Sequence, residues 1–411
     1  MQSLLSFFLL LLFSINLQCQ ISSNNKNLNI KVPQGFLIQE IAKDIGRARH
    51  IAITPQGVIY IKSSKLKNGK GIFQLQLKGK EIAVESFGNY EGTGIAIKKG
   101  YLYATSNEEV FRYKLDNYGK VINKNQPELI ITGLINRRQH ASKSITLDED
   151  DNIYVNIGAY SNSCQIDDRT QGSLGKNPCS ILDSAGGIWK FKTNKLNQTY
   201  AQGMRYATGL RNVVGLDWNT QTNSLFVMQH GRDQLHDLFP EIYDTKQSAD
   251  LPSECMYELH NGDNCGWPYI YYDHFQNKKI IAPEYGGDAK KSTEDYLNPV
   301  IAFPAHLAPN GLLFYTGNQF PDRYKNGAFI AFHGSWNRAP EPQEGYYVVF
   351  VPFKEGKPIG NWEIFADGFA GKEITPRAAK HRPCGLAQDS DGALYVTDDT
   401  KGSIFKITYK K

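Results

Sequence analysis

The sequence has 411 residues, of which 41% are hydrophobic, 12% aromatic and 21% charged, and its formal net charge is +5 at pH 7. This composition excludes a globally disordered chain and supplies enough apolar side chains for a large core. The positive charges are spread along the chain without a long basic block, which argues against a nucleic-acid partner or a membrane-surface protein.

The N-terminus carries an apolar run from Leu4 to Ile15 that is followed by a polar break. The run is too short to span a bilayer and is typical of a signal peptide, although no Lys or Arg precedes it. We predict a signal peptide over residues 1–19, cleaved near Cys19, and a short extension over residues 20–33. The protein is then exported, periplasmic or secreted, with no stable membrane span.

A two-part pattern recurs six times after this extension. Its first part is a tight turn followed by an apolar-aromatic strand, which ends at Ile61, Ala104, Val155, Val227, Ala331 and Val396. Its second part is another strand: GIFQLQL, EVFRYKL, GGIWKFK, LHDLFPEIY, YYVVFVPF and GSIFKITY. Such units cannot bury both faces alone and stack around an axis. The pattern predicts an all-β fold, a six-bladed β-propeller with four-stranded antiparallel blades around a central channel.

One domain is expected over residues 34–411, because no long Pro-, Gly- or Ser-rich linker divides the chain. The early apolar segment 35–45 is predicted to add a strand to the last blade and so close the ring. Two long insertions, roughly 158–184 and 243–303, are expected to lie on one face as loops that shape a site.

The cysteines fall into two close pairs after Cys19. Cys164 precedes Cys179, and Cys255 precedes Cys265, at spacings that suit local disulfides in an oxidising compartment. We expect both pairs to form disulfides and Cys384 to remain unpaired. A zinc site is the weaker alternative, because no pair has the two-residue spacing of a zinc knuckle.

Three stretches beside predicted strands combine cationic, amide and aromatic side chains. Their candidate residues are His140 and Lys143; Arg211, Asn212, His230, Gly231 and Arg232; and His306, His333, Trp336, Arg338 and Arg382. Histidine suits proton transfer near neutral pH, and guanidinium groups beside an aromatic face suit a flat polyanion. Each stretch also has a plain alternative. His140 could be a solvated loop residue, Arg232 could pair with Asp233 or Asp237, Trp336 could be core and Arg382 could cap a blade edge.

The same stretches carry a family resemblance. The segments HASKSITLD, SNSC, LRNVVG, QHGRDQL, GWPYIYYD, FPAHLAPNGLLFYTG, FHGSWNRAP, GYYVVFVPF and RPCGLA occur in order. They resemble the signature segments of pyrroloquinoline-quinone-dependent sugar dehydrogenases of the sorbosone and aldose type, with a more distant resemblance to soluble quinoprotein glucose dehydrogenases. The resemblance covers nearly the whole mature chain.

The resemblance implies that pyrroloquinoline quinone (PQQ) and Ca²⁺ bind in the central channel and that a sugar or related alcohol or aldehyde is oxidised. It assigns the three carboxylates of PQQ to Arg211, Arg338 and Arg382, stacking to Trp336 and a hydrogen bond to Asn212. Lys143 and Arg49 are further candidates for cofactor binding. The backbone carbonyls of Gly231 and Arg232 are expected to coordinate calcium, which polarises the quinone as a Lewis acid.

His140 is the first choice for the base that takes the substrate hydroxyl proton, and His306 is its competitor. Two departures bear on cofactor affinity. Thr316 stands where distant relatives carry Lys, and Lys143 stands where many relatives carry Arg. An external electron acceptor is required, because the sequence has no C-x-x-C-H haem motif.

Two other functions fit a propeller. A calcium-dependent lactonase or esterase would need carboxylates and amides that converge on the metal, whereas these clusters are rich in cations and aromatic rings. A non-catalytic propeller that binds glycans or proteins is the other alternative, because the fold alone does not establish function.

Overall fold

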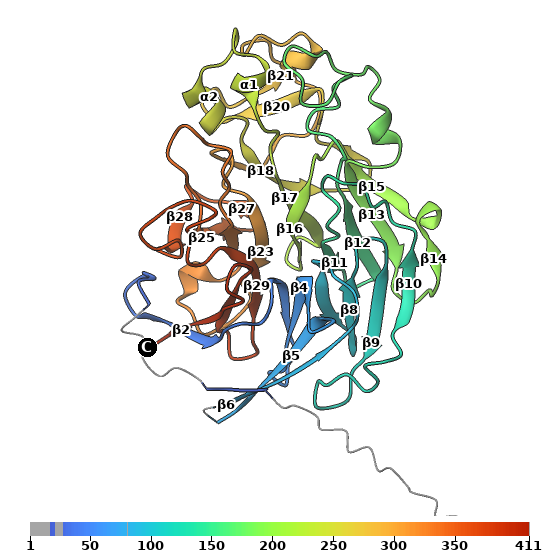
Figure 1. Ribbon diagram of the computed structural model, residues 1–411, viewed down its shortest axis with the longest axis vertical. Helices are drawn as coiled ribbons and strands as arrows, with labels where there is room; N and C mark the ends of the chain where they lie inside the picture. The colour runs from blue at the N-terminus through green and yellow to red at the C-terminus, as the bar shows by residue number, and fades with distance from the viewer. Residues whose placement is uncertain (1–16, 21–27, 80, 411) are drawn as a thin grey trace, which may run out of the picture.

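The predicted propeller is confirmed in the computed structural model, which describes residues 17–20, 28–79 and 81–410. Six sheets of four or five strands are arranged as blades around an axis (Figure 1). Neighbouring blades pack through apolar side chains that point from one sheet to the next. The ring of sheets therefore buries faces that no single blade could bury.

Each of the first three blades has five strands, named from the inner strand outward. Blade 1 is β3 (Ala48–Ile53), β4 (Ile59–Lys67), β5 (Lys70–Lys78), β6 (Glu81–Phe87) and β1 (Leu17–Gln20). Blade 2 is β7 (Ile95–Lys98), β8 (Tyr101–Thr105), β9 (Val110–Lys114), β10 (Glu128–Thr132) and β14 (Gln198–Thr199). Blade 3 is β11 (Ile145–Leu147), β12 (Asn152–Ile157), β13 (Gly187–Lys192), β15 (Met204–Thr208) and β19 (Asp263–Asn264). The outermost strands β14 and β19 pair in parallel, so these two blades depart from the purely antiparallel pattern that was predicted.

The last three blades are four-stranded. Blade 4 is β16 (Val213–Asn219), β17 (Ser224–Gln229), β18 (Glu254–Leu259) and β22 (Ile301–Phe303). Blade 5 is β23 (Pro309–Phe314), β24 (Ala328–Phe332), β25 (Tyr347–Val351) and β28 (Glu363–Ala366). Blade 6 is β29 (Pro383–Gln388), β30 (Leu394–Asp398), β31 (Ile404–Tyr409) and β2 (Phe36–Ala42).

The ring is closed as expected, because β2 comes from the start of the propeller and pairs antiparallel with β31 at its end. Phe36 of β2 packs edge-on against Phe320, Tyr324 and Phe365 of blade 5. Edge-to-face aromatic contacts of this kind stabilise a core beyond the area that they bury. The closing strand therefore joins blade 6 by hydrogen bonds and blade 5 by packing.

Five of the six repeats were predicted correctly, and their two parts are the second and third strands of each blade. The prediction was wrong for LHDLFPEIY, which begins with the short helix α1 (Leu235–Leu238) and continues as a loop. The third strand of blade 4 is β18, which lies inside the segment predicted to be an insertion. The error arose because the aliphatic-aromatic composition of LHDLFPEIY suits a helix packed on the body as well as a strand.

About half of the helices and remaining short elements of the described residues lie in the insertions. They are α2 (Thr245–Asp250), the hairpins β20 (Ile270–Asp273) with β21 (Lys278–Ile281) and β26 (Phe353–Lys354) with β27 (Lys357–Pro358), and four 3₁₀ turns at 180–183, 200–202, 283–285 and 322–324. The elements α1, α2, β20 and β21 gather at one end of the molecule, at the top of Figure 1. The parts of the second insertion outside the blade strands β18, β19 and β22 thus lie at this end, whereas those three strands depart from the prediction.

Most of the predicted signal peptide, residues 1–16, lies outside the described residues, and the export prediction is not tested by the fold. Among the residues that the structure describes, no helix has the length and apolarity needed to cross a bilayer.

Candidate functional site

The six inner strands surround an axial cavity of about 310 Å³. Short stretches of each strand line it: 50–53, 95–98, 145–147, 216–218, 311–313 and 386–388. The candidate residues lie where these strands begin, because Arg49, Arg211 and Arg382 are each within the first residues of an inner strand or just before it. The second strand of a blade runs antiparallel to the inner one, so residues that follow it, such as Gly231 and His333, reach the same end.

Arg211 is buried at the centre of the first cluster. Its guanidinium donates to Gly231 O at 2.8 Å, to Asp233 Oδ2 at 2.7 Å and to both the backbone and side-chain oxygens of Asn162. Asp233 also accepts from Arg169 and Asn337. Burial opposes the charge of Asp233, but Arg211, and after it His306 and Arg169, hold its pKa below the ordinary value. This carboxylate fixes the orientation of Arg211.

His140 lies beside this cluster, and its tautomer is set by the backbone. Nδ1 is 2.5 Å from Ala159 O, which can only accept, so Nδ1 carries the proton and Nε2 is a free base in the neutral ring. Burial, and after it the charge of Arg211, lowers the pKa of His140 to about 3. The ring is therefore neutral near pH 7 with an unprotonated Nε2, and the low pKa makes it a weaker base than an ordinary histidine.

Gly158 brings His140 and Asn212 together. A Cβ on Gly158 would lie 2.6 Å from His140 Cβ and 3.0 Å from Asn212 Oδ1, so a larger residue would force them apart. Asn156 donates to Asn212 Oδ1 at 3.4 Å and holds that amide in place.

His306, the competing base, has a carbonyl partner at one ring nitrogen and a carboxylate oxygen beyond hydrogen-bond distance from the other. Nε2 is 2.9 Å from Ser248 O, and Nδ1 is 3.8 Å from Asp233 Oδ1. The ring is 4% exposed, and burial lowers its pKa. These contacts suit a residue that positions Asp233 better than one that meets substrate.

A second cluster lies across the channel. Arg49 donates to Asp399 at 2.9 Å, and the same carboxylate is 2.8 Å from His333 Nε2. Arg382 donates to the carbonyls of His333 and Gly334. Burial opposes the charge of Asp399, but His333 and Arg49 hold its pKa below the ordinary value.

His230 lies between the two clusters. Its pKa is lowered to about 3 by burial and then by the charge of Arg211, with Arg49 as a smaller cause. Its Nε2 donates to Pro309 O at 3.2 Å. The predicted Arg49, Arg211 and Arg382 are therefore brought to one end of the channel with His140.

Lys143, Arg338 and Trp336 are placed differently. Lys143 is fully buried and donates to Ala141 O at 2.5 Å, and burial lowers its pKa to about 7. The guanidinium of Arg338 is occupied by Asp250 and by the carbonyls of Ala249 and Pro342. Trp336 is 66% exposed, so it is not a core residue.

The turn that carries the predicted calcium ligands is held by side chains. Gly231 N donates to Glu254 at 3.1 Å, and Gly231 O accepts from Arg211. The side chain of Arg232 pairs with Glu284 at 2.7 Å, with neither Asp233 nor Asp237 as its ion-pair partner. In the part of the chain that the structure describes, no group of three or more His, Cys, Asp or Glu side chains could hold a metal. A cation here would depend on backbone carbonyls.

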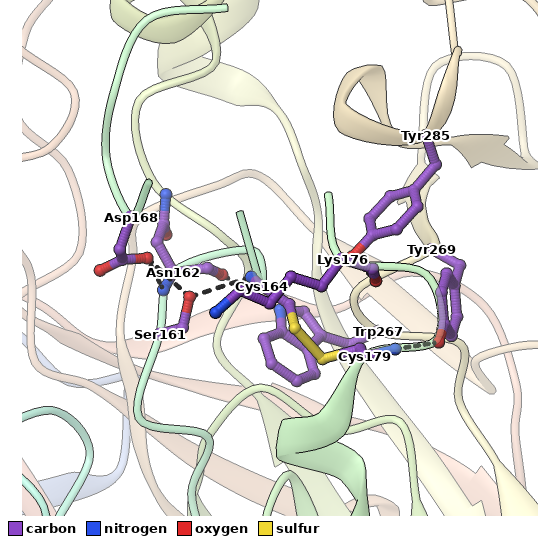
Figure 2. Close-up of a disulfide and its surroundings, with 9 residues drawn as sticks. All are labelled: Ser161, Asn162, Cys164, Asp168, Lys176, Cys179, Trp267, Tyr269 and Tyr285. Atoms are coloured by element: carbon purple, nitrogen blue, oxygen red, sulfur yellow. Dashed lines mark hydrogen bonds between the residues drawn. A yellow bond between two sulfur atoms is a disulfide. The ribbon is translucent and has the colours of Figure 1, made fainter. Parts of the chain in front are cut away.

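The first insertion braces the site through a disulfide (Figure 2). Cys164 and Cys179 are bonded, as predicted. Within the loop, Asp168 accepts from Ser161 Oγ at 2.6 Å and from Asn162 N at 3.1 Å, and Trp267 Nε1 donates to Asn162 O at 3.1 Å. Asn162 is thereby fixed where it holds Arg211.

The second predicted disulfide is wrong. Cys255 and Cys265 are free thiols, and Cys384 is also free, as expected. Cys255 and Cys265 are buried in the apolar core between blades 3 and 4, and burial raises the pKa of both thiols. Cys255 belongs to the central strand β18 and pairs there with Gln229, so closeness in sequence did not indicate a bonded pair.

Residue types alone do not identify the carboxylates that orient the arginines. The sequence suggests Asp233 only as an alternative partner of Arg232, and it does not point to Asp399, Glu254 or Glu284. Asp233 could have been identified as a site residue from its position in QHGRDQL, directly after the predicted metal ligands. Asp399 and Glu284 are far in sequence from their partners, so only folding brings them together.

Comparison with known proteins gives a family match over almost the whole propeller. The TrAA12-like family model matches residues 30–410. A protein of Borreliella burgdorferi is 27% identical over 397 residues, covering 93% of this chain and 91% of that protein. The pyrroloquinoline quinone-dependent pyranose dehydrogenase of Coprinopsis cinerea is 27% identical over 235 residues, which cover 48% of this chain but only 30% of that relative.

Solved structures share the fold at low sequence identity. A calcium structure of a Trichoderma reesei protein of Carbohydrate-Active Enzymes Family AA12 has a TM-score of 0.76 and 19% identity, and the match covers 94% of this chain and 100% of that one. The holo form of the pyranose dehydrogenase PQQ domain from Coprinopsis cinerea has a TM-score of 0.71 and 18% identity, with 93% and 97% of the two chains covered.

Proposed function

This chain belongs to the TrAA12-like family, and on that premise we propose that it is an exported PQQ-dependent dehydrogenase that oxidises a sugar. The observation that carries the proposal is that Arg49, Arg211 and Arg382 lie at the starts of inner strands, at one end of the channel, with His140 next to Arg211 through Ala159. Guanidinium groups in a buried site suit a planar polyanion. The names of the Coprinopsis cinerea relative and structure, both described as pyranose dehydrogenases with PQQ, support this cofactor and substrate class.

The residues present fit PQQ. Arg49 Nε and Ser144 Oγ are buried without a hydrogen-bond partner among the described residues, which is unusual in a folded protein and leaves polar capacity at the site. We assign the cofactor carboxylates to Arg49, Arg211 and Arg382, and a hydrogen bond near the quinone to Asn212. Lys143 and Trp336 remain further candidates. Arg338 is paired with Asp250, as Arg211 is with Asp233 and Arg49 with Asp399, and it remains a further candidate.

When bound, PQQ supplies an ortho-quinone that accepts a hydride from the substrate carbon. His140 Nε2 takes the proton of the substrate hydroxyl, and Ala159 O keeps the opposite side of the ring protonated and oriented. Asp233 holds Arg211 against the site, and His306 would pair with Asp233 only in its protonated form. The two electrons then pass to an external acceptor.

Calcium is assigned to the carbonyls of Gly231 and Arg232, supported by the calcium structure of the Trichoderma reesei neighbour. Asp233 places negative charge beside this turn, which favours a divalent cation. Gly231 O already accepts from Arg211, so a cation would share that oxygen or shift the guanidinium.

Reconstitution tests the proposal. Purified protein without cofactor is mixed with PQQ and Ca²⁺, and dye reduction is followed with pyranoses, other aldoses, sorbosone and polyols, with each addition omitted in turn. We expect sugar-dependent reduction that requires both additions. Failure to bind PQQ would overturn the proposal. It would favour either a lactonase, which an ester-hydrolysis assay would detect, or a propeller that binds glycans.

A further inference from the structure

Glu254 begins β18 in blade 4 and is 3% exposed. Its carboxylate accepts from two backbone amides, Gly231 N at 3.1 Å and Ala308 N at 3.4 Å. These amides belong to different blades, since Gly231 follows β17 and Ala308 precedes β23. One side chain thus joins the predicted calcium turn to the loop that carries His306.

The charge of Glu254 has no cationic partner. None of the ion pairs among the described residues includes it, and the neighbouring Arg211 already pairs with Asp233. A carboxylate that is buried without a counter-charge is costly, and two amide hydrogen bonds offset only part of the cost. Burial accordingly raises the pKa of Glu254 to about 8, and a cation that binds nearby would favour the charged form of this side chain.

Both segments joined by Glu254 have constrained backbones. A Cβ on Gly231 would lie 2.8 Å from Pro252 O, so the turn packs tightly against the segment that leads into Glu254. In the other loop, His306 and Ala308 have φ values of 64° and 57°, which side-chain-bearing residues adopt rarely. Conformations of this kind persist only where neighbouring groups hold them.

We propose that Glu254 is a positioning residue for the cation: through its hydrogen bonds to the amides of Gly231 and Ala308 it orients the Gly231 turn so that the carbonyls of this turn face the ion. This inference rests on the proposed calcium site. In this inference Glu254 contacts neither substrate nor PQQ. Its side chain acts on the cation through the backbone amide of Gly231.

The test is Ca²⁺ binding to the full-length protein without PQQ, measured by calorimetry for the wild type, Glu254→Gln and the matched control Glu258→Gln. Glu258 lies on the same strand and accepts from Ser224 Oγ, away from the calcium turn. We expect Glu254→Gln to weaken Ca²⁺ binding at least tenfold and Glu258→Gln to leave it unchanged. A residue with a merely structural role would lower the melting temperature without changing this affinity.

Unchanged Ca²⁺ affinity in a folded Glu254→Gln variant would overturn the inference while leaving the proposed function intact. If that variant does not fold, Glu254→Asp carries the test, because it keeps the charge but cannot reach both amides; its affinity must also fall. A wild type that binds PQQ but no Ca²⁺ overturns this inference and the calcium assignment, whereas a wild type that binds neither overturns the proposed function itself.

Discussion

The two candidate bases, His140 and His306, differ in the partners of their ring nitrogens. His140 donates from Nδ1 to a backbone carbonyl and leaves Nε2 free, whereas His306 has a partner near each nitrogen. A general base must hold a lone pair within reach of the proton that it removes. We therefore favour His140 as the base and regard His306 as a positioning residue for Asp233.

Replacing His140 with Gln should lower kcat by roughly 10²- to 10⁴-fold, the usual contribution of a positioned base, while PQQ affinity changes little. Stopped-flow reduction of the bound cofactor by the sugar and a PQQ titration measure the two quantities separately. His306→Gln is the comparison variant and should have the smaller effect on the reduction rate. The reverse order of effects would transfer the base to His306.

The disulfide-closed insertion is the element that positions Arg211 from outside its own blade. Asn162 accepts from Arg211 through two oxygens and is itself held by Asp168 and Trp267. The bond between Cys164 and Cys179 closes this segment over a separation of 15 residues. A surface loop is thus made part of the site.

Replacing both Cys164 and Cys179 with Ser should lower the free energy of unfolding by up to about 3 kcal/mol, the value for closing a loop of this length. It should also weaken PQQ binding, because Asn162 would hold Arg211 less firmly. Chemical denaturation and cofactor titration measure the two effects.

In the wild type, alkylation of the denatured, unreduced protein should label Cys255, Cys265 and Cys384 but neither Cys164 nor Cys179. Protection of Cys255 and Cys265 would show that they are bonded after all.

At the scale of the whole molecule, the channel exists only while the ring is closed. Closure depends on β2, which is held by β31 and by the aromatic cluster around Phe36. The two arginine clusters come from blades on both sides of the channel, so they depend on this closure even though β2 contributes no candidate residue.

Phe36→Ala should destabilise the protein by about 3–5 kcal/mol, because it removes a buried ring and leaves a cavity between blades 5 and 6. Leu37→Ala is the control, since Leu37 is the next residue of the same strand but is 38% exposed; it should cost far less. Thermal unfolding of the PQQ-free protein measures both. Equal losses for the two variants would mean that Phe36 does not close the ring.

Much of the fold was predictable because each blade repeats a local pattern. Turn residues followed by alternating apolar and aromatic residues identify the second and third strands, which pair with their sequence neighbours. The third strand of blade 4 was missed because the chain first forms α1 and α2 and only then returns to the sheet. No local pattern marks such a delayed return.

The sequence by itself determined the repeat number and the closing strand, because these depend on local patterning and neighbouring segments. Only the tertiary structure decided which nitrogen of each histidine is free, that Arg338 is occupied, that Cys255 and Cys265 are unbonded, and that Asp399 and Glu284 hold arginines distant in sequence. The physical reason is that such contacts depend on distance and orientation between blades, which residue types and spacing do not encode.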